Sequence, residues 1–327
     1  MNIIIAKFGG TSVADEKARG FAIERVKSLC AQGFGVVAVV SAMGRKGAPY
    51  ATDTLLSLIR PASGGESGAS SPRARDLLMS CGETISACVF ADSLEQAGVP
   101  ACPMNGFTAG IATDGVYNAA NITGMDASRV KAALEAGLVP VITGFQGISK
   151  GLEVTTLGRG GSDTSAVEIG GYLGAQGVII YTDVPGVAEA DPRIVPEARF
   201  LSETDAQDML ALAENGAGVI HPRAVRALMR FNIPVWVRST FDDAPGTLLR
   251  PMAEKPRGLV GLAVKKGDMP EEEVVSALAR PIPMALLQQA KDALPHADIS
   301  VEGDLLRARV PENAAAQTVR TLYGLLR

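Results

Sequence analysis

The feature that most constrains the fold is a series of short, almost continuous runs of Val, Ile and Leu, separated by longer segments with helical periodicity. The apolar runs lie at residues 3–7, 35–41, 139–143 and 178–181. Segments with the apolar spacing of helices lie at residues 15–32, 73–96, 163–173 and 204–215. Strands that are apolar on both faces and alternate with helices predict an α/β fold, in which a largely parallel sheet is covered on both sides.

A chain of 327 residues is long enough for about two domains. The pattern breaks into Pro and charged residues at 251–257, which predicts a boundary there. We therefore expect one domain over residues 1–250 and a small α+β module over 257–327. Within that module we expect a strand at 258–264, a helical stretch up to 294, short strands at 298–301 and 305–310, and a helix from 313.

Composition disfavours several classes of partner. The net charge is −4 and no Lys or Arg cluster is present, which argues against binding to nucleic acid or to a membrane surface. No run of apolar residues approaches the roughly 20 needed to span a membrane, and the first residues lack the features of a signal peptide. We expect a cytoplasmic protein. The Gly- and Ser-rich segment 62–75 predicts a surface loop.

Cysteine and histidine offer little material for metal or nucleophilic chemistry. The only histidines are His221 and His296, so a zinc site or a histidine-based catalytic pair is disfavoured and no metal-ligating residues are assigned. The cysteines are widely spaced in apolar segments with no C-x-x-C pattern, which predicts buried free thiols; they are Cys30, Cys81, Cys88 and Cys102.

The first candidate site follows the first strand, in the sequence Lys7-Phe8-Gly9-Gly10-Thr11-Ser12. Ligands of parallel sheets bind at the carboxyl ends of the strands, and glycines there let backbone N–H groups approach phosphate oxygens. Lys7 would then be a point charge for a phosphate. An equally good interpretation is a tight turn with a helix cap and a solvated lysine.

The second candidate site is residues 156–166, TLGRGGSDTSA, which again join a strand to a helix. Arg159 has the planar fork that grips a carboxylate through two hydrogen bonds, and a helix start favours anionic groups. The alternative is an ordinary helix entry capped by Ser162 or Asp163, although capping does not require the arginine. A third segment, YTDVPGV followed by ADPR, brings Arg193 onto a loop where it could meet a nucleotide phosphate.

Taken together, the motifs resemble the amino-acid kinase family and, within it, the aspartate kinases. The resemblance rests on KFGGTSV, SAMGR, ATDTLL, SCGET, TLGRGGSDTSA, YTDVPGV, ADPR and GAGVIHPRAV, which occur in that order within residues 1–250. It implies a three-layer αβα amino-acid kinase fold, followed by a degenerate ACT-like module. It also implies transfer of the ATP γ-phosphate to the β-carboxylate of L-aspartate, the first step toward lysine, diaminopimelate, threonine and methionine.

The resemblance assigns roles around the phosphates. It places Lys7 on them as charge stabiliser, Asp163 near the reacting groups as organiser, and Gly9 and Gly10 along the phosphate path. Mg²⁺ is implied as a bridge between the β- and γ-phosphates, held mostly by water and phosphate oxygens. A carboxylate is already ionised at neutral pH and is itself the nucleophile, so no strong general base is needed.

The resemblance also assigns the substrate and the nucleoside. Arg159 would clamp the α-carboxylate of aspartate and Glu83 would hold its ammonium group, with the pocket completed by Ser41, Thr52 and Ser162. From the residues alone, strand-end and cap roles for Ser41 and Thr52 and an exposed helix position for Glu83 remain alternatives. For the nucleotide, the matching residues are Thr182, Asp183 and Arg193.

Three departures from the family pattern bear on activity. Gly218 stands where the family usually has a lysine that contacts nucleotide, and Ala188 where many relatives have an aromatic residue. Residues 257–327 resemble at most one ACT-like unit, which leaves feedback control by amino acids open. Two other hypotheses follow: a regulatory paralogue that binds aspartate or nucleotide and partners with another kinase, or a kinase with a different acceptor. The family analogy also implies a homodimer.

Overall fold

A computed structural model describes residues 1–62 and 68–327. Residues 63–67, in the middle of the predicted surface loop, lie outside the described residues. The chain forms two compact units: unit 1 comprises Met1–Pro185 with Arg226–Pro245, and unit 2 comprises Gly186–Val225 with Gly246–Arg327.

The centre of unit 1 is a parallel sheet with neighbouring strands in the order β11-β9-β1-β2-β6-β3. The strands are β1 (Ile3–Phe8), β2 (Gly35–Val40), β3 (Ala101–Met104), β6 (Val139–Thr143), β9 (Gly177–Thr182) and β11 (Val235–Ser239). The four predicted apolar runs are therefore confirmed as β1, β2, β6 and β9. Their side chains are buried on both faces, which is what selects uninterrupted Val and Ile.

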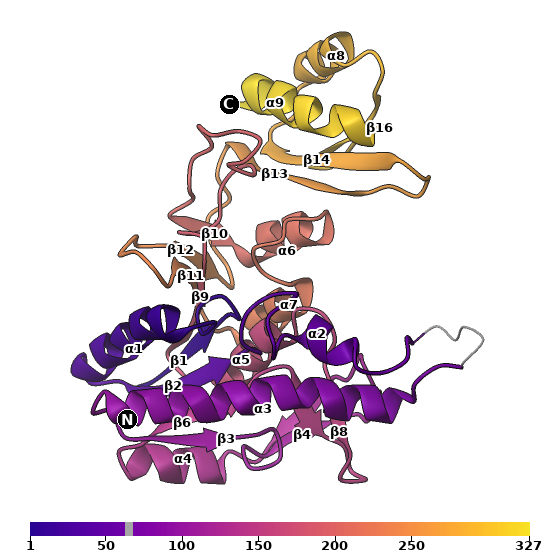
Figure 1. The fold of residues 1–327 in the computed structure, drawn as a ribbon. Coiled ribbons are helices and arrows are strands. Elements are labelled where there is room, and N and C mark those ends of the chain that lie inside the picture. The colour runs from indigo at the N-terminus through magenta and orange to yellow at the C-terminus, as the bar shows by residue number, and fades with distance from the viewer. Residues whose placement is uncertain (63–67) are drawn as a thin grey trace. The chain divides into compact units, whose positions relative to one another are not determined.

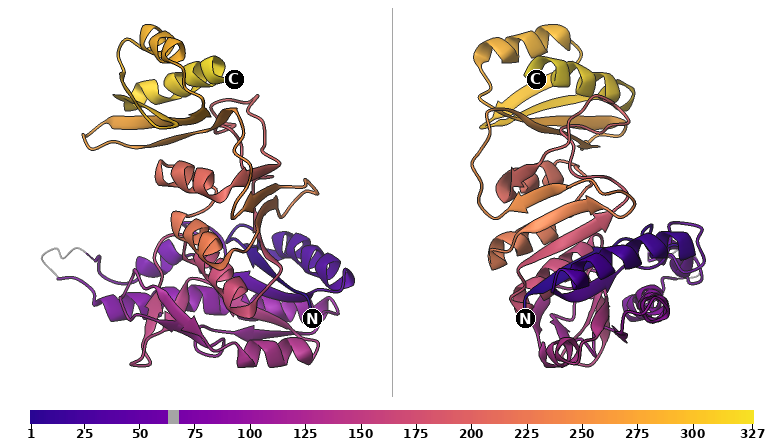
Figure 2. Two further views of the ribbon diagram at one scale, coloured as in Figure 1. Left: turned by 180° about the vertical axis from the view of Figure 1, so that it is seen from behind. Right: turned by 90° about the vertical axis from the view of Figure 1, so that its left-hand side faces the viewer.

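Helices cover both faces of this sheet, as Figures 1 and 2 show. The helices of unit 1 are α1 (Glu16–Ala31), α2 (Thr52–Leu56), α3 (Pro72–Gln96), α4 (Ser128–Glu135) and α5 (Gly161–Leu173). α1 and α3 pack on the face that carries Phe8, whose ring centroid lies 5.3 Å from that of Phe90. α5 packs on the opposite face, where Gly170 leaves room for Ile5. This arrangement is the expected three-layer αβα fold.

A second, 4-stranded sheet in unit 1 has the order β5-β4-β7-β8. Its strands are β4 (Ile111–Thr113), β5 (Ile122–Met125), β7 (Gln146–Ile148) and β8 (Val154–Thr156). No pattern in the sequence predicts this sheet, because strands of three or four residues are too short for an alternation of apolar and polar residues to stand out.

α3 is long and apolar enough, by length and composition, to cross a membrane, although no apolar run of that length was expected from the sequence. Half of its most apolar window is buried inside the protein, and it carries the buried carboxyl side chains of Asp76 and Glu83. A core helix of a globular domain passes the same test, so α3 is weak evidence for a membrane span.

Unit 2 contains a parallel strand pair and a separate 4-stranded antiparallel sheet in the order β13-β14-β16-β15. Its strands are β10 (Glu203–Asp205), β12 (Thr247–Arg250), β13 (Gly258–Lys266), β14 (Glu272–Arg280), β15 (Asp298–Glu302) and β16 (Leu305–Pro311). Its helices are α6 (Ala206–Glu214), α8 (Met284–Ala293), a 3-10 turn η1 (Glu312–Ala314) and α9 (Ala315–Leu326). α7 (Pro222–Phe231) begins in unit 2 and ends in unit 1. α8 and α9 lie on one side of the antiparallel sheet (Figure 2).

Two predictions are wrong. The stretch before residue 294 is not all helix, because β14 precedes α8 and pairs with both β13 and β16. Its Ala- and Glu-rich sequence suits a helix, but pairing on two sides outweighs that local preference. The cysteines are free as predicted, but they are not all buried: Cys81 and Cys88 are exposed on α3, because both fall on the side of that helix that faces away from the core.

Candidate active site

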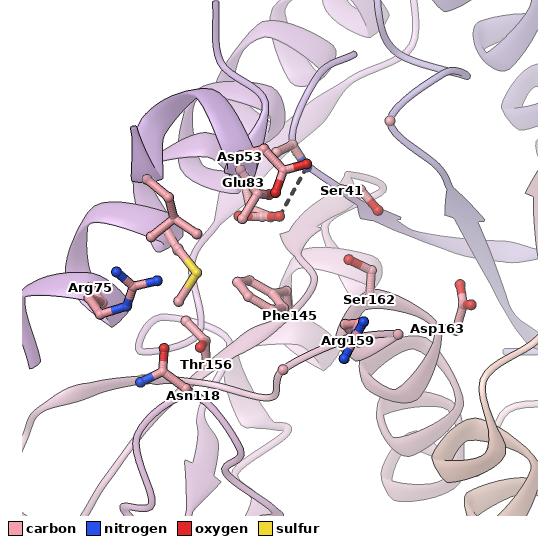
Figure 3. A pocket seen from close by; sticks show the side chains of 18 of the residues that line it. Ser41, Asp53, Arg75, Glu83, Asn118, Phe145, Thr156, Arg159, Ser162 and Asp163 are labelled. Carbon is pink, nitrogen blue, oxygen red and sulfur yellow. Dashed lines mark hydrogen bonds between the residues drawn. The ribbon is translucent and has the colours of Figure 1, made fainter. Parts of the chain in front are cut away.

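A cavity of about 860 Å³ opens at the carboxyl end of the parallel sheet in unit 1. It brings together most of the residues predicted from the motifs, namely Lys7, Gly10, Ser41, Thr52, Glu83, Arg159, Ser162 and Asp163. Lys7 lies on β1 and Ser41 directly follows β2. Glu83 lies on α3, and Ser162 and Asp163 lie in the first turn of α5. Figure 3 shows Ser162, Arg159 and Asp163 on one wall of the cavity and Glu83 on another.

Lys7 and Asp163 form an ion pair inside this cavity. The Lys7 Nζ atom lies 2.6 Å from Asp163 Oδ1, and the two side chains are only 10% and 15% exposed. The pair joins the carboxyl end of strand β1 to the first turn of α5, whose N-terminus carries a partial positive charge. The alternative of a solvated lysine is therefore wrong, and a cation and a helix N-terminus face the same space.

The loop after β1 fits closely under the loop after β2. A Cβ atom on Gly10 would lie 2.6 Å from the carbonyl oxygen of Gly44 and 2.7 Å from that of Ala42, so only glycine allows this approach. The Gly44 N–H donates to the Gly10 carbonyl at 2.9 Å. Gly9 is adjacent but does not line the cavity; a Cβ there would make ordinary contacts, the nearest being 3.7 Å from Lys7 Nζ.

Glu83 is a buried carboxyl group at the cavity wall, with a residue exposure of only 3%. Its Oε1 atom accepts a hydrogen bond from the Ala42 N–H at 3.1 Å, drawn as a dashed line in Figure 3. Its Oε2 atom is buried and has no hydrogen-bond partner within residues 1–62 and 68–327. Burial raises the pKa of Glu83 to about 7, against the opposing effect of the Ala42 hydrogen bond. The alternative of an exposed helix charge is wrong.

Arg159 stands on a tight turn before α5, between two glycines with left-handed backbone conformation. Gly158 has φ +74° and Gly160 has φ +66°, and Gly160 is the N-cap of α5. The helix therefore has no side-chain cap, and the interpretation of Ser162 or Asp163 as the cap is wrong. The Arg159 side chain makes no ion pair or hydrogen bond with the described part of the chain, so its planar fork remains open to a ligand.

Ser162, Ser41 and Thr52 complete the wall. Ser162 packs against Gly144, where a Cβ would lie 2.8 Å from its hydroxyl oxygen. Ser41 follows β2, and Thr52 is the first residue of α2. The N-cap of α2 is Ala51, with no side-chain cap, so the capping alternative for Thr52 is wrong.

Sequence reasoning missed several lining residues, among them Arg75, Met79, Asn118, Phe145 and Thr156. Arg75, Met79 and Glu83 are four residues apart along α3 and so share one face of it. That spacing was the available signal for Arg75. Asn118 and Phe145 lie outside every motif of the sequence, and Thr156 begins the TLGRGGSDTSA motif without having been assigned a role.

Asp76 is a buried carboxylate that organises this missed wall. It is 0% exposed and accepts hydrogen bonds from the Asn118 N–H and, at 2.7 Å, from the Thr156 N–H. The Thr156 hydroxyl donates to its other oxygen at 3.0 Å. Burial raises the pKa of Asp76, while these hydrogen bonds act in the opposite direction. One carboxylate therefore ties a loop and a strand of the small sheet to α3.

The residues predicted for the nucleotide are less closely gathered. Thr182 ends β9, beside β1, and Asp183 follows it; neither lines the cavity. Asp183 forms an exposed ion pair with Arg45, at 2.5 Å. Arg193 belongs to unit 2, where it pairs with Asp191 at 2.6 Å.

Comparison with known proteins agrees with the resemblance to the amino-acid kinases that the motifs indicated. Residues 2–239 match the model of the amino acid kinase family. Aspartokinase 1 of Bacillus subtilis (strain 168) is 46% identical over 249 residues, 76% of this chain and 61% of that protein. The aspartokinase of Geobacillus stearothermophilus is 41% identical over 250 residues, 76% of this chain and 59% of that protein. The chain thus spans about three fifths of the length of these curated relatives.

Solved structures confirm the fold. Escherichia coli aspartokinase III in complex with aspartate and ADP is similar with a TM-score of 0.83 and 22% identity, covering 99% of this chain and 100% of that chain. Aspartate kinase from Synechocystis is similar with a TM-score of 0.67 and 32% identity, covering 99% of this chain and 56% of that chain. The expected amino-acid kinase fold with a C-terminal α+β sheet is therefore confirmed.

Proposed function

The chain belongs to the amino acid kinase family, and on that premise we propose that it transfers the γ-phosphate of ATP to the β-carboxylate of L-aspartate, forming 4-phospho-L-aspartate and ADP. The observation that carries this proposal is a single cavity lined by Lys7, Glu83, Arg159 and Asp163. It combines cations for phosphate and carboxylate with one buried acid for an ammonium group.

The substrate end of the cavity is suited to an α-amino acid. The guanidinium of Arg159, which has no partner within residues 1–62 and 68–327, donates two parallel hydrogen bonds to the α-carboxylate. The Oε2 atom of ionised Glu83 accepts a hydrogen bond from the α-ammonium group, which gives a partner to a buried atom that has none among the described residues. Ser41, Thr52 and Ser162 offer hydroxyl groups to the rest of the substrate. This arrangement supports an acceptor with both charges of a free amino acid.

The chemical step requires positioning and charge stabilisation. The β-carboxylate attacks the γ-phosphorus as the Pγ–O bond to ADP breaks, so no proton has to be removed from the nucleophile. Lys7 stabilises the negative charge on the transferred group, and the open N-terminus of α5 contributes N–H groups. Asp163 holds the Lys7 ammonium group in place through their ion pair. Gly10 has no side chain, so the loop after β2 can lie close to the loop after β1.

The nucleotide and its metal complete the proposal. Thr182 and Asp183 are proposed to contact adenosine, and Arg193 a phosphate, by similarity to the family motifs. Mg²⁺ binds through one or two carboxylates together with phosphate oxygens and water, and Asp163 in the cavity wall fits that requirement. When bound, Mg²⁺ would neutralise charge on the β- and γ-phosphates.

We further propose that residues 1–250 act as the catalytic domain and 257–327 as a small ACT-like module, since the latter forms an antiparallel sheet with two helices on one side. Association of such modules through their sheets would give a homodimer, and a cytoplasmic location suits the pathway.

Gly218 supports a second candidate function, that of a regulatory paralogue with weak catalysis. The expected lysine is replaced there by a residue without a side chain. Such a protein would bind aspartate or nucleotide without efficient turnover and would partner with another kinase.

A panel of acceptors tests the leading proposal. ADP release should depend on L-aspartate and should be absent with N-acetylglutamate, glutamate or uridylate. Turnover with one of those acceptors and not with aspartate would contradict the assignment. Aspartate binding without any turnover, together with a stable complex with a second kinase, would favour the regulatory function.

A further inference from the structure

Arg159 stands on a turn that its own side chain does not fix. The guanidinium makes no ion pair or hydrogen bond with residues 1–62 and 68–327. Gly158 and Gly160 flank it, and the turn between them is closed by a hydrogen bond from the Gly161 N–H to the Gly158 carbonyl at 3.0 Å. Because glycine is the most flexible residue, the backbone that precedes the turn must decide where Arg159 lies.

Two contacts support the turn on that side. The Leu157 N–H donates to the Phe145 carbonyl at 2.8 Å. Gly158 lies directly against the backbone of Asn118, since a Cβ atom on Gly158 would be 2.6 Å from the Asn118 carbonyl oxygen. Asn118 has φ +61°, a left-handed conformation that residues with a side chain adopt rarely. Such a conformation persists only where neighbouring groups hold it in place.

The group that holds Asn118 is the buried carboxylate of Asp76, on α3. Its two oxygens lie 3.1 and 3.0 Å from the backbone nitrogen of Asn118. They also accept the Thr156 N–H at 2.7 Å and the Thr156 hydroxyl at 3.0 Å. Thr156 ends β8, three residues before Arg159. Figure 3 shows Asn118 and Thr156 in the cavity wall, with Arg159 on the loop beyond them.

Asp76 itself has no access to a ligand. It is 0% exposed and does not line the cavity, whereas Asn118, Thr156 and Arg159 do. An ionised carboxylate only accepts hydrogen bonds, and here both of its oxygens are occupied by donors from the protein. Any effect of Asp76 on a ligand must therefore pass through the residues that it binds.

We propose that Asp76 is a positioning residue for the substrate: by holding Asn118 and Thr156, it sets the place from which the Arg159 guanidinium meets the α-carboxylate. This role rests on the proposed aspartate kinase function, because it requires Arg159 to bind the substrate. It assigns the buried acid of α3 to substrate affinity and leaves the transfer of phosphate unaffected.

Two substitutions separate this role from a general loss of packing. In Asp76→Asn, the remaining oxygen can accept both backbone N–H groups, and the new NH₂ group can donate to the Thr156 hydroxyl. Asp76→Ala leaves both N–H groups buried without an acceptor, so we expect it to raise the aspartate KM by about tenfold or more. The asparagine variant should restore a KM near that of wild type. In both, kcat and the ATP KM should stay close to wild type.

Combination with Arg159→Ala tests whether Asp76 acts through the arginine. Once the guanidinium is gone, Asp76→Ala should add little to the aspartate KM, whereas two independent effects would multiply. Asp208→Ala is the matched control, since Asp208 is a 2% exposed carboxylate paired with Arg280 in unit 2. It should lower the melting temperature and leave the aspartate KM unchanged. Effects that multiply, or an equal rise in the control, would overturn the proposal.

Hydrogen exchange of the protein without ligand tests the structural step alone. Amides of residues 156–161 should exchange faster in Asp76→Ala than in wild type or Asp76→Asn, while those of α1 stay protected. Should the alanine variant not fold, Asp76→Ser, with one short acceptor, takes its place in every measurement. Unchanged exchange at 156–161 would overturn the proposal. If wild type neither binds nor phosphorylates aspartate, the proposed function fails, and faster exchange there would still support the positioning of Arg159.

Discussion

Glu83 makes substrate binding depend on pH. Its pKa is about 7 in the folded protein, so it is mostly neutral at pH 6 and mostly ionised at pH 8. If the carboxylate holds the substrate's ammonium group, kcat/KM for aspartate should rise with pH through about 7, since that ratio reports pKa values of the free enzyme. Steady-state kinetics from pH 6 to 8.5 measure this. A flat profile in wild type would remove Glu83 from substrate binding.

The same group should cost stability when ionised. Between the ordinary pKa of 4.5 and the folded value of about 7, the unfolded chain has lost the proton that the folded chain keeps, so rising pH favours unfolding. Glu83→Gln keeps an acceptor for the Ala42 N–H and cannot ionise. We expect the variant to be more stable than wild type at pH 8 by up to about 3 kcal/mol, with little difference at pH 4.5. Denaturant unfolding at the two pH values checks this, and its kcat/KM for aspartate should be low at both.

Arg159 should act on substrate affinity alone. Removing its charge-assisted hydrogen bonds costs about 1.5–3 kcal/mol, so Arg159→Ala should raise the aspartate KM by roughly 10- to 100-fold. The melting temperature should stay unchanged, because the side chain is exposed and unpaired in the described structure. Arg159→Lys keeps the charge without the fork and should lie between. An unaltered KM for the alanine variant would exclude the clamp.

At the scale of the element, the glycines after β1 can be compared directly. Gly10→Ala places a methyl group 2.6 Å from the Gly44 carbonyl, so the loop after β2 must move and take the Ala42 N–H from Glu83. We expect a loss of about 1–3 kcal/mol of stability together with a loss of activity. Gly9→Ala meets nothing closer than 3.7 Å and should lower the melting temperature less. Equal shifts would contradict this account of the turn.

The helices and strands differ in how well the sequence predicts them. β1, β2, β6 and β9 are long buried runs, and their pattern alone identifies them. The strands of the small sheet are too short for that, and β14 is misread because Ala, Leu and Glu favour helix until pairing on both sides decides otherwise. In the site, Lys7 and Arg159 could be predicted because each lies in a recognisable motif, KFGGTSV and TLGRGGSDTSA. Arg75 and its neighbour Asp76 lie eight and seven residues before Glu83, both close to two helical turns, so the spacing that pointed to Arg75 did not exclude Asp76.

At the scale of the whole molecule, Gly218 tests how the nucleotide is held. A Cβ atom there would meet nothing within 4 Å, so Gly218→Lys can be accommodated without repacking. A restored charge-assisted contact of about 1.5–3 kcal/mol should lower the ATP KM roughly tenfold or more, with little effect on the aspartate KM. An unchanged ATP KM would show that this position does not reach the nucleotide.

The sequence could not predict which side chains of the long helix α3 are exposed to solvent. The motifs indicated the parallel sheet, its ligand-binding edge and a small C-terminal module, because each rests on local pattern. The exposure of Cys81 and Cys88 depends on how α3 is rotated against the sheet, and the apolar character of their neighbours pointed to burial instead.

Trapping the acyl phosphate with hydroxylamine tests whether the protein phosphorylates the β-carboxylate of aspartate. Purified protein is incubated with ATP, Mg²⁺, L-aspartate and hydroxylamine, and aspartyl hydroxamate is measured beside Lys7→Ala. Wild type should form hydroxamate only when both ATP and aspartate are present, and Lys7→Ala should form no more than background. No hydroxamate from wild-type protein that still binds aspartate would contradict the kinase assignment and favour the regulatory paralogue.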